Sequence, residues 1–244
     1  MIWKKARKGI VGIEAAIVLI AFVIVAAALA FVVLNMGFTT TQKSGAVIQS
    51  GLGEASTALE VDGSVLAYSE KGDNINYTVI PIKVSPGRHY VDLDPGRASI
   101  LYWSTEAGSF ADVYVVYGYI QYSNGKYYLV AKYEDGTALY NGSTDGTVSE
   151  IGSSINITKI WELLDEKLEE DVYAAVIWVD YMGSFDTNLE VGEKAIVIVA
   201  FNTESVQPKA YQTVKFEIKP PTGAPLTVEK TMPPGIDEGV IDLG

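Results

Sequence analysis

Few residues of this 244-residue chain could carry out nucleophilic, acid–base or metal chemistry. The chain has no cysteine, and His89 is its only histidine. A Ser–His nucleophile system would therefore depend on His89 alone, and this residue follows Pro86-Gly87-Arg88, which is typical of a turn. Disulfides, Cys/His metal clusters and covalent haem attachment are excluded by composition. We interpret His89 as a structural loop residue, and we expect neither enzymatic activity nor a cofactor.

Carboxylates offer a weaker candidate site. Asp186, Asn188 and Glu190 alternate in a predicted loop, as oxygen ligands of calcium sometimes do. The remainder of an EF-hand loop is absent, so this pattern does not by itself predict a bound metal. The acidic run within residues 166–171 is interpreted as the solvated face of a helix.

Three sequons for N-linked glycosylation are present, each a plausible glycan site if the domain is exported. They are Asn76-Tyr77-Thr78, Asn141-Gly142-Ser143 and Asn156-Ile157-Thr158. Asn141 is the best candidate, because it lies in a loop rich in Gly, Ser, Thr and Asp. Asn156 also suits a second role as the N-cap of a short helix.

A more specific pattern lies near the N-terminus, where a basic head precedes a long apolar run. The basic residues of the head are Lys4, Lys5, Arg7 and Lys8. From Ala15 to Leu34, twenty consecutive residues are apolar, and a helix of that length spans about 30 Å, the thickness of a bilayer's hydrocarbon core. The run is therefore long enough to cross a membrane.

The small residue Gly9 lies before this apolar run. A secretory signal has a shorter apolar core, of about 7–15 residues, followed by a small-residue cleavage site. Two interpretations are open. The run is an ordinary N-terminal anchor, or the chain is cleaved between Gly9 and Ile10 on the cytoplasmic side, which leaves the helix on the mature protein.

Charge is unevenly divided along the chain. The net charge is −12 even though the first eight residues carry four basic side chains. An acidic body argues against nucleic-acid binding, because it offers no cationic surface to replace counterions. A basic head that stays in the cytoplasm and an exported body agree with the orientation rule for membrane segments.

The elements that would hold these residues form two parts. The first is one long helix over about residues 10–60, because Ile48, Leu52 and Leu59 continue an apolar stripe on one face. The stop signal is the Asp-Gly pair at residues 62–63. The first half of this helix is apolar all round, so it requires burial in lipid or protein along its whole circumference.

The second part, residues 61–244, contains nine β-branched and aromatic runs separated by turn residues. Asn124-Gly125 between two of them predicts a hairpin with a type I′ turn. One amphipathic helix is expected near residues 157–170, and the proline-rich tail can add only an edge strand. The predicted fold class is α+β, a long N-terminal helix followed by an immunoglobulin-like antiparallel β-sandwich.

The junction at the N-terminus resembles a known signal. Lys8-Gly9-Ile10, with Gly12 and Glu14 at the third and fifth positions after the break, is similar to the class III signal of type IV pilins and archaeal flagellins. Residues 10–38 resemble archaeal flagellins (archaellins) in detail. Near the other end, KPPTGAPLTVEKTMPP resembles their C-terminal strand region. The resemblance extends over essentially the full chain, although its middle carries little of it.

This resemblance implies a structural subunit of an archaeal flagellum filament that serves swimming. The N-terminal helices would form the filament core and the β-domains its outer shell. A prepilin-type signal peptidase would remove residues 1–9 from a membrane precursor whose basic end is cytoplasmic. The mature chain would be extracellular, with many copies of itself as partners. Two rivals stay open: an archaeal adhesion pilin, and a membrane-anchored extracellular β-domain that binds a ligand or acts as an enzyme.

Glu14 has a role that can be argued physically. A carboxylate on an apolar helix costs about 2.5–3.5 kcal/mol at a bilayer centre, so its presence suggests a partner. Cleavage would create one, the α-amine of Ile10, one helical turn away. The resemblance implies that the amine of a neighbouring subunit pairs with Glu14 and sets the axial register. The other interpretation is that Glu14 only marks the membrane surface.

The apolar run also constrains assembly. It holds thirteen large apolar residues, and exposing them to water would cost on the order of 20–40 kcal/mol. The helix must therefore pass directly from lipid into a filament. Because this transfer exchanges one apolar environment for another, extraction needs work. That need implies an assembly ATPase as a partner. The resemblance to archaellins further implies that this ATPase also drives rotation and acts with a membrane platform.

Overall fold

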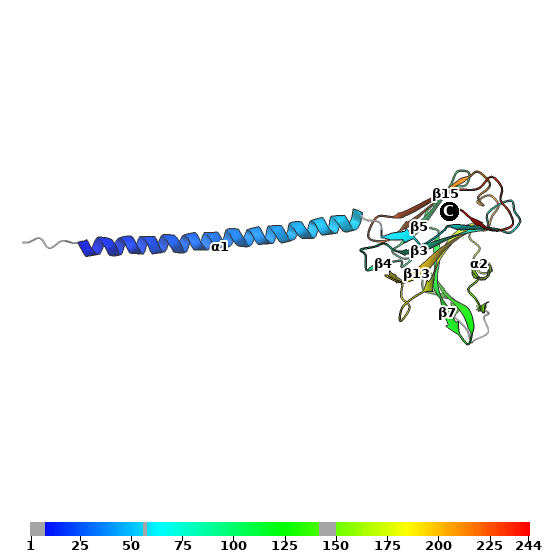
Figure 1. Cartoon of the computed structure of the whole chain (residues 1–244), viewed down its shortest axis with the longest axis horizontal. Coiled ribbons are helices and arrows are strands. Elements are labelled where there is room, and N and C mark those ends of the chain that lie inside the picture. Colours follow the sequence, from blue (N-terminus) through cyan, green and yellow to red (C-terminus); the bar gives the residue numbers. More distant parts are fainter. Residues whose placement is uncertain (1–7, 56–57, 142–149) are drawn as a thin grey trace, which may run out of the picture. The chain divides into compact units, whose positions relative to one another are not determined.

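The computed structural model describes residues 8–55, 58–141 and 150–244 of the chain (Figure 1). These residues form two compact units that divide between Gly53 and Glu54. The first is almost entirely one long helix. The second is a β-rich body with its own hydrophobic cores.

Helix α1 runs without interruption from Lys8 to Ala55. Its residues are mostly Ala, Ile, Leu, Val and Phe, and it contains no proline, so nothing in the sequence breaks the hydrogen-bond ladder. At 48 residues it is about 70 Å long. By length and composition, Gly12–Glu54 could cross a membrane.

The predicted end of this helix near Leu59 is wrong. Leu59 opens strand β1 (Leu59–Val61) and pairs with Val84 of β3 (Tyr77–Val84). Its side chain is fully buried in the body. The helical spacing of Ile48, Leu52 and Leu59 therefore predicted a helix that extends too far. Burial of Leu59 against the sheet, rather than this spacing, determines its conformation.

The described residues of the body form three β-sheets. The strands of the largest sheet are β1 (Leu59–Val61), β2 (Leu66–Ser69), β3 (Tyr77–Val84), β7 (Tyr114–Ser123), β8 (Lys126–Tyr133), β9 (Ala138–Asn141), β10 (Glu150–Gly152), β11 (Val172–Asp180), β13 (Lys194–Phe201) and β16 (Gly239–Asp242). The second sheet consists of β15 (Leu226–Thr231), β14 (Thr213–Lys219), β5 (Ser99–Ser104) and β6 (Gly108–Phe110). A two-stranded sheet pairs β12 (Asn188–Glu190) with β4 (Tyr90–Asp92).

The main sheet has the order β10-β8-β7-β11-β13-β3-β2-β16, with β1 also on β3 and β9 on β8. Its pairs are antiparallel except for β7 with β11, which is parallel. The predicted class of a long helix followed by an antiparallel β domain is confirmed. Each of the nine predicted runs contains a strand, and the described residues add further short strands. The proline-rich tail supplies β15 and β16, both at sheet edges as expected.

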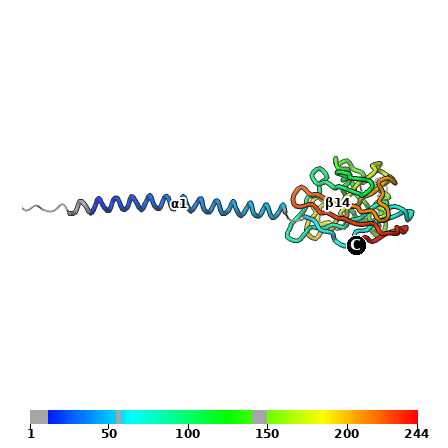
Figure 2. Tube along the Cα trace, turned by 90° about the horizontal axis from the view of Figure 1, so that it is seen from above, coloured from blue at the N-terminus to red at the C-terminus, as the bar shows by residue number. Residues whose placement is uncertain are grey.

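Strand β11 shows how the body is layered. Ala174, Val176 and Trp178 face one core, whereas Tyr173 and Ile177 face another. The first core lies between the main sheet and the sheet of β14 and β5, and Figure 2 shows β14 crossing the body. The second core lies under α2. Because both faces are covered, β11 reads as a continuous apolar run rather than an alternating one.

The hairpin between β7 and β8 has the predicted turn. Asn124 and Gly125 have φ values of 52° and 81°, the two positive angles that a type I′ turn requires. Within the hairpin, Gly118 lies opposite Ala131. This hairpin and α2 lie on the same side of the body in Figure 1.

Helix α2 (Ile157–Asp165) is shorter than the predicted 157–170. It buries Ile160, Leu163 and Leu164 against the sheet. Leu168 is also buried, but it lies beyond the helix, where its carbonyl oxygen accepts a hydrogen bond from the Asn202 amide at 3.2 Å. The helix ends early because the chain turns at this point to enter β11.

Candidate assembly helix and modification sites

The proposed cleavage junction lies near the start of α1. Lys8, Gly9 and Ile10 belong to the helix. The basic residues Lys4, Lys5 and Arg7 lie outside the described residues. The backbone at the Gly9–Ile10 bond is thus helical in the uncleaved chain.

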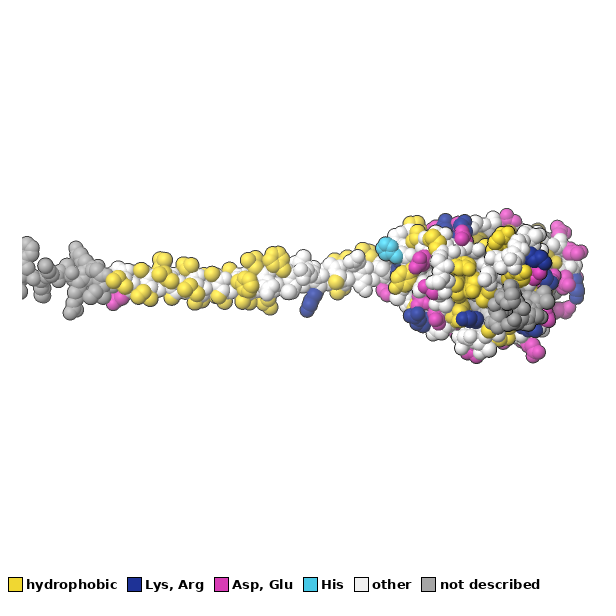
Figure 3. Space-filling model, turned by 90° about the horizontal axis from the view of Figure 1, so that it is seen from below, with side chains coloured by type: hydrophobic (Ala, Val, Ile, Leu, Met, Phe, Trp, Pro, Cys, Tyr) yellow, Lys and Arg dark blue, Asp and Glu magenta, His cyan; other side chains and the backbone are white. Residues whose placement is uncertain are grey.

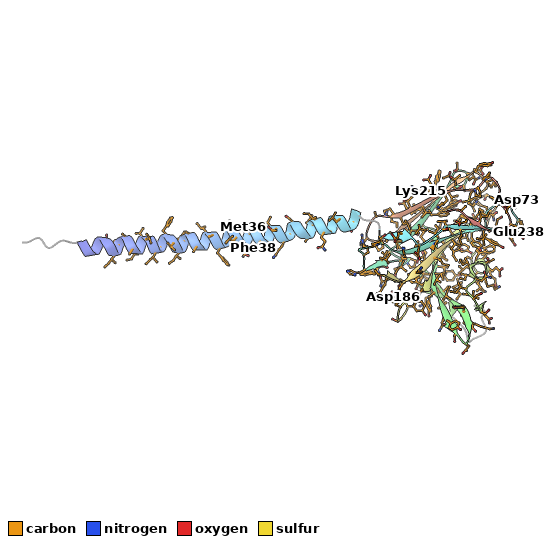
Figure 4. The ribbon with its side chains drawn as sticks, in the orientation of Figure 1. Met36, Phe38, Asp73, Asp186, Lys215 and Glu238 are labelled. Carbon is orange, nitrogen blue, oxygen red and sulfur yellow. The ribbon has the colours of Figure 1, made fainter. Side chains whose placement is uncertain are left out.

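The side chains of α1 have almost no partner within its own unit. From Gly12 to Leu52 every residue is exposed, and the large apolar side chains range from Val32, 52% exposed, to Phe22, 73% exposed. Figure 3 shows hydrophobic side chains around the N-terminal half of the helix, and Figure 4 shows Met36 and Phe38 projecting from it. An isolated helix in water could not keep this surface exposed. The helix needs lipid or other protein around it.

Glu14 lies at the N-terminal end of this apolar surface, one helical turn after Ile10. It is exposed, and Ala15, Val18 and Leu19 adjoin it along the helix. None of the ion pairs among the described residues includes Glu14. Its carboxylate is therefore available for a partner outside its own helix.

Three consecutive threonines interrupt the apolar character in the middle of α1. The hydroxyl groups of Thr39, Thr40 and Thr41 each donate to a backbone carbonyl one turn earlier, with the bonds of Thr40 and Thr41 at 2.8 and 2.9 Å. The helix satisfies these polar groups internally, so this turn also tolerates an apolar environment.

The three sequon asparagines differ in their surroundings. Asn76 is half-buried, and its Oδ1 accepts a hydrogen bond from the Glu70 backbone N–H at 2.8 Å. Thr78, the hydroxyl residue of that sequon, is fully buried in β3. Asn141 ends β9, and its side chain lies outside the described set.

Asn156 is exposed and forms the N-cap of α2, as the sequence suggested. Its Oδ1 accepts a hydrogen bond from the Lys159 backbone N–H at 3.3 Å. The sequon hydroxyl of Thr158 contacts the Tyr77 hydroxyl at 3.0 Å. Because the cap uses Oδ1, the Nδ2 atom that would carry a glycan is not required for it.

Of the three alternating residues predicted to lie in a loop, only Asp186 does so, because Asn188 and Glu190 are the first and last residues of strand β12. The Asn188 backbone N–H donates to Asp186 Oδ1 at 2.9 Å, and the Asn188 amide donates to Asp186 Oδ2 at 3.3 Å. The Glu190 backbone N–H donates instead to Glu193. Figure 4 shows Asp186 at the opposite end of the body from Asp73 and Glu238. Across the described residues, no group of three or more His, Cys, Asp or Glu side chains is arranged to hold a metal ion.

Two features of the body were not predicted. Asp62 joins two strands, because its carboxylate contacts Lys83 of β3 at 3.1 Å and Lys194 of β13 at 2.7 Å. The hydrogen bonds from Lys194 and Lys83 lower the pKa of Asp62. From the sequence, Asp62 was interpreted only as part of the stop signal of the long helix, since the strand pairing that brings the lysines together is not visible there.

The second feature that was not predicted is an open polar cleft beside α2, lined in part by Glu70, Trp161 and Asp165. Burial and the nearby charge of Glu70 raise the pKa of Asp165. Trp161 stacks on Tyr77 with ring centroids 5.1 Å apart. His89, for comparison, is exposed in the loop before β4 and takes part in no such cluster.

Comparison with known proteins matches residues 9–230 to the model of the family described as archaeal-type flagellin. The chain is 40% identical to a probable flagellin 1 of Aeropyrum pernix, over 98% of this chain and all of that one. It is 28% identical to a probable flagellin 1 of Archaeoglobus fulgidus, over 98% and 97% of the two chains. The crystal structure of flagellin FlaB1 from Methanocaldococcus jannaschii has a TM-score of 0.51 at 20% identity, and the match covers 76% of this chain and 95% of that one. That structural likeness concerns the fold.

Proposed function

Because the chain belongs to the archaeal-type flagellin family and is a filament subunit, we propose that α1 forms the filament core and that Ile10 is the first residue of the mature protein. The body would form the outer shell of an extracellular filament. Because the family is one of structural flagellins, we infer a structural rather than an enzymatic role.

The exposed apolar surface of α1 is the observation that carries this proposal. In the described part of the helix's own unit, nothing covers Phe22, Phe31 or their neighbours. Copies of the same helix would bury these side chains against one another. Ala26, Ala27 and Ala28 allow close approach of helix backbones. The same surface suits a bilayer before assembly, so one helix serves both the precursor and the filament.

The positive charges of the basic head support removal of residues 1–9. Lys4, Lys5, Arg7 and Lys8 favour a cytoplasmic position in the precursor, and they would be costly inside an apolar core. Cleavage after Gly9 by a prepilin-type signal peptidase removes all four. It also creates an α-amine at Ile10, which we assign as the partner of Glu14 in a neighbouring subunit.

Extraction from the membrane requires work, because the helix exchanges one apolar environment for another and gains little from hydrophobic burial. An assembly ATPase with a membrane platform would supply this work and, in a flagellum, rotation. The exposure of Asn156 makes it a better candidate for glycosylation than Asn76, whose carboxamide and sequon hydroxyl are engaged or buried. Asn141 is a candidate on the composition of its loop, which is rich in Gly, Ser, Thr and Asp.

Deletion of the chain tests the swimming role. The deletion strain should lack filaments and should not swim in soft agar, and the unchanged chain should restore both. A strain that swims normally but no longer attaches to surfaces would instead identify an adhesion pilin.

Glu14→Ala tests the register role. We expect this variant to be cleaved normally but to form at least about tenfold less filament, because the Ile10 amine then lacks its partner. Glu134→Ala removes an exposed carboxylate of the body and should have no effect. Normal filaments from Glu14→Ala would remove the register role from Glu14.

A further inference from the structure

The described part of α1 from Gly12 onward has three charged residues, Glu14, Lys43 and Glu54. Lys43 follows Glu14 by 29 residues, and Glu54 follows Lys43 by 11. On an uninterrupted helix these separations are about 8.1 and 3.1 turns. All three charges therefore lie along one side of the helix, within an arc of roughly 40°. Figure 3 shows acidic and basic side chains projecting from the same side of the helix in that view.

Lys43 has no acidic partner on its own helix. The positions three and four residues away are Thr40, Thr39, Ala46 and Val47, and only such positions are neighbours on a helix surface. Glu54 is about 16 Å away along the axis, which exceeds the reach of the two side chains. The ion pairs among the described residues all lie in the body.

Lys43 differs from the other polar residues in this part of the helix in how its side chain is satisfied. The hydroxyls of Thr39, Thr40 and Thr41 are satisfied by backbone carbonyls. The ammonium group of Lys43 has no such internal solution. An ammonium group enclosed by neighbouring helices without an opposite charge is strongly unfavourable.

We propose that Lys43 forms an ion pair with Glu54 of a second copy of this chain in the filament, and that this pair fixes an axial offset of about 16 Å between contacting helices. The inference rests on the proposed role of α1 as the filament core. With the Ile10 amine and Glu14, the mature helix then carries charges of alternating sign along one side. Each has a partner on a neighbour.

Glu54 is favoured over Glu14 as the partner because of helix overlap. Pairing with Glu14 would shift two helices by about 44 Å, most of their length, whereas pairing with Glu54 leaves about 50 Å of overlap. The larger overlap buries more apolar surface. Glu54 is exposed, and among the described residues its carboxylate accepts one long hydrogen bond, 3.5 Å from the Gly223 backbone N–H.

Charge exchange tests the pair. Lys43→Glu and Glu54→Lys should each reduce filament yield at least about tenfold while leaving leader cleavage unchanged. Lys43→Glu/Glu54→Lys should recover yield to within about threefold of the unchanged chain, because the pair is restored in reverse. Lys43→Glu/Glu134→Lys restores the net charge at an exposed site of the body and should remain defective. Recovery in that control, or none in the exchange variant, would overturn the proposal.

Cross-linking gives a second test, since the chain has no cysteine. Lys43→Cys/Glu54→Cys replaces both partners, so no unpaired charge remains to block assembly. The two thiols of one chain are about 16 Å apart along the helix, too far for a disulfide. Oxidised filaments should therefore yield a ladder of covalent oligomers in denaturing gels. Filaments that give only monomers would contradict the proposed contact.

A separate label distinguishes this inference from the role of α1. Leu29→Cys should be unreactive to a maleimide in intact filaments, whereas Glu134→Cys should react. A reactive Leu29→Cys would refute the core role of the helix. A protected Leu29→Cys together with no ladder and no charge-exchange recovery would refute only the Lys43–Glu54 pair.

Discussion

The hydroxyl group of Tyr114 donates a hydrogen bond of 2.7 Å to the backbone carbonyl of Leu93. Both residues are buried, and the bond ties the first residue of β7 to the loop that follows β4. Burial raises the pKa of Tyr114 well above its ordinary value, so the phenol stays a neutral donor. The contact joins segments that sequence patterns treat as independent.

Tyr114→Phe should leave the Leu93 carbonyl without a partner in a dry environment. We expect the free energy of unfolding of the body to fall by about 1–3 kcal/mol. Urea denaturation followed by tryptophan fluorescence measures this change. Tyr122→Phe, at a tyrosine that is 64% exposed, is the control and should have little effect. Equal stability of the two variants would show that the bond contributes nothing.

Gly118 allows β7 and β8 to approach closely. A Cβ atom there would lie 2.8 Å from Ala131 Cα and would also collide with the Val130 carbonyl oxygen, both backbone atoms. Gly118→Ala should therefore destabilise the body by about 1–3 kcal/mol. Gly235→Ala introduces the same methyl group where no atom lies within 4 Å, and its melting temperature should match or exceed that of the unchanged body. An unaltered melting temperature for Gly118→Ala would contradict this packing.

Asp62 predicts a pH dependence. Its pKa is lowered in the folded state by Lys194 and Lys83 from the ordinary value of 3.8. The stabilisation is therefore fully present above pH 3.8 and is lost as the pH falls through the lower folded value. Asp62→Asn should be less stable than the unchanged body at neutral pH, and the two should converge in acid. Asp237→Asn, at an exposed carboxylate, should show no such convergence. A constant difference between Asp62→Asn and the unchanged body at all pH values would argue against the ion-pair origin.

Substitutions of Asn156 distinguish its role as the N-cap of α2 from its role as a glycan acceptor. Asn156→Asp keeps the side-chain oxygen that accepts from Lys159 and removes the glycan acceptor. This variant should retain the stability of α2 and lose any glycan mass at this sequon. Asn156→Ala should lose both, with a cost of about 1 kcal/mol. Peptide mass spectrometry of filaments and thermal unfolding provide the two readouts. A glycan retained on Asn156→Asp filaments would assign it to another residue.

Local signals in the sequence predicted much of the fold. Asn124-Gly125 defined a turn because two adjacent positive φ angles strongly favour this pair. The N-cap at Asn156 was likewise local. The end of α1 was misplaced because Leu59 fits a helical stripe equally well, and only its pairing with Val84 settles its conformation.

Contacts between residues far apart in the sequence could not be predicted from such local signals. Asp62 meets Lys194 only because β3 and β13 are neighbours in the sheet. The parallel pairing of β7 with β11 likewise depends on the whole topology. Lys43 is an intermediate case. Helical periodicity aligns Lys43 with Glu14 and Glu54. This alignment holds only because α1 is one uninterrupted helix, which the structure shows.

The N-terminus of the mature chain tests the account most directly. Surface filaments sheared from cells can be purified and their subunit analysed by intact mass and N-terminal peptide spectrometry. We expect polymeric filaments whose subunit begins at Ile10 and lacks Lys4, Lys5, Arg7 and Lys8. A subunit that begins at Met1 and fractionates with membranes as a monomer would contradict it.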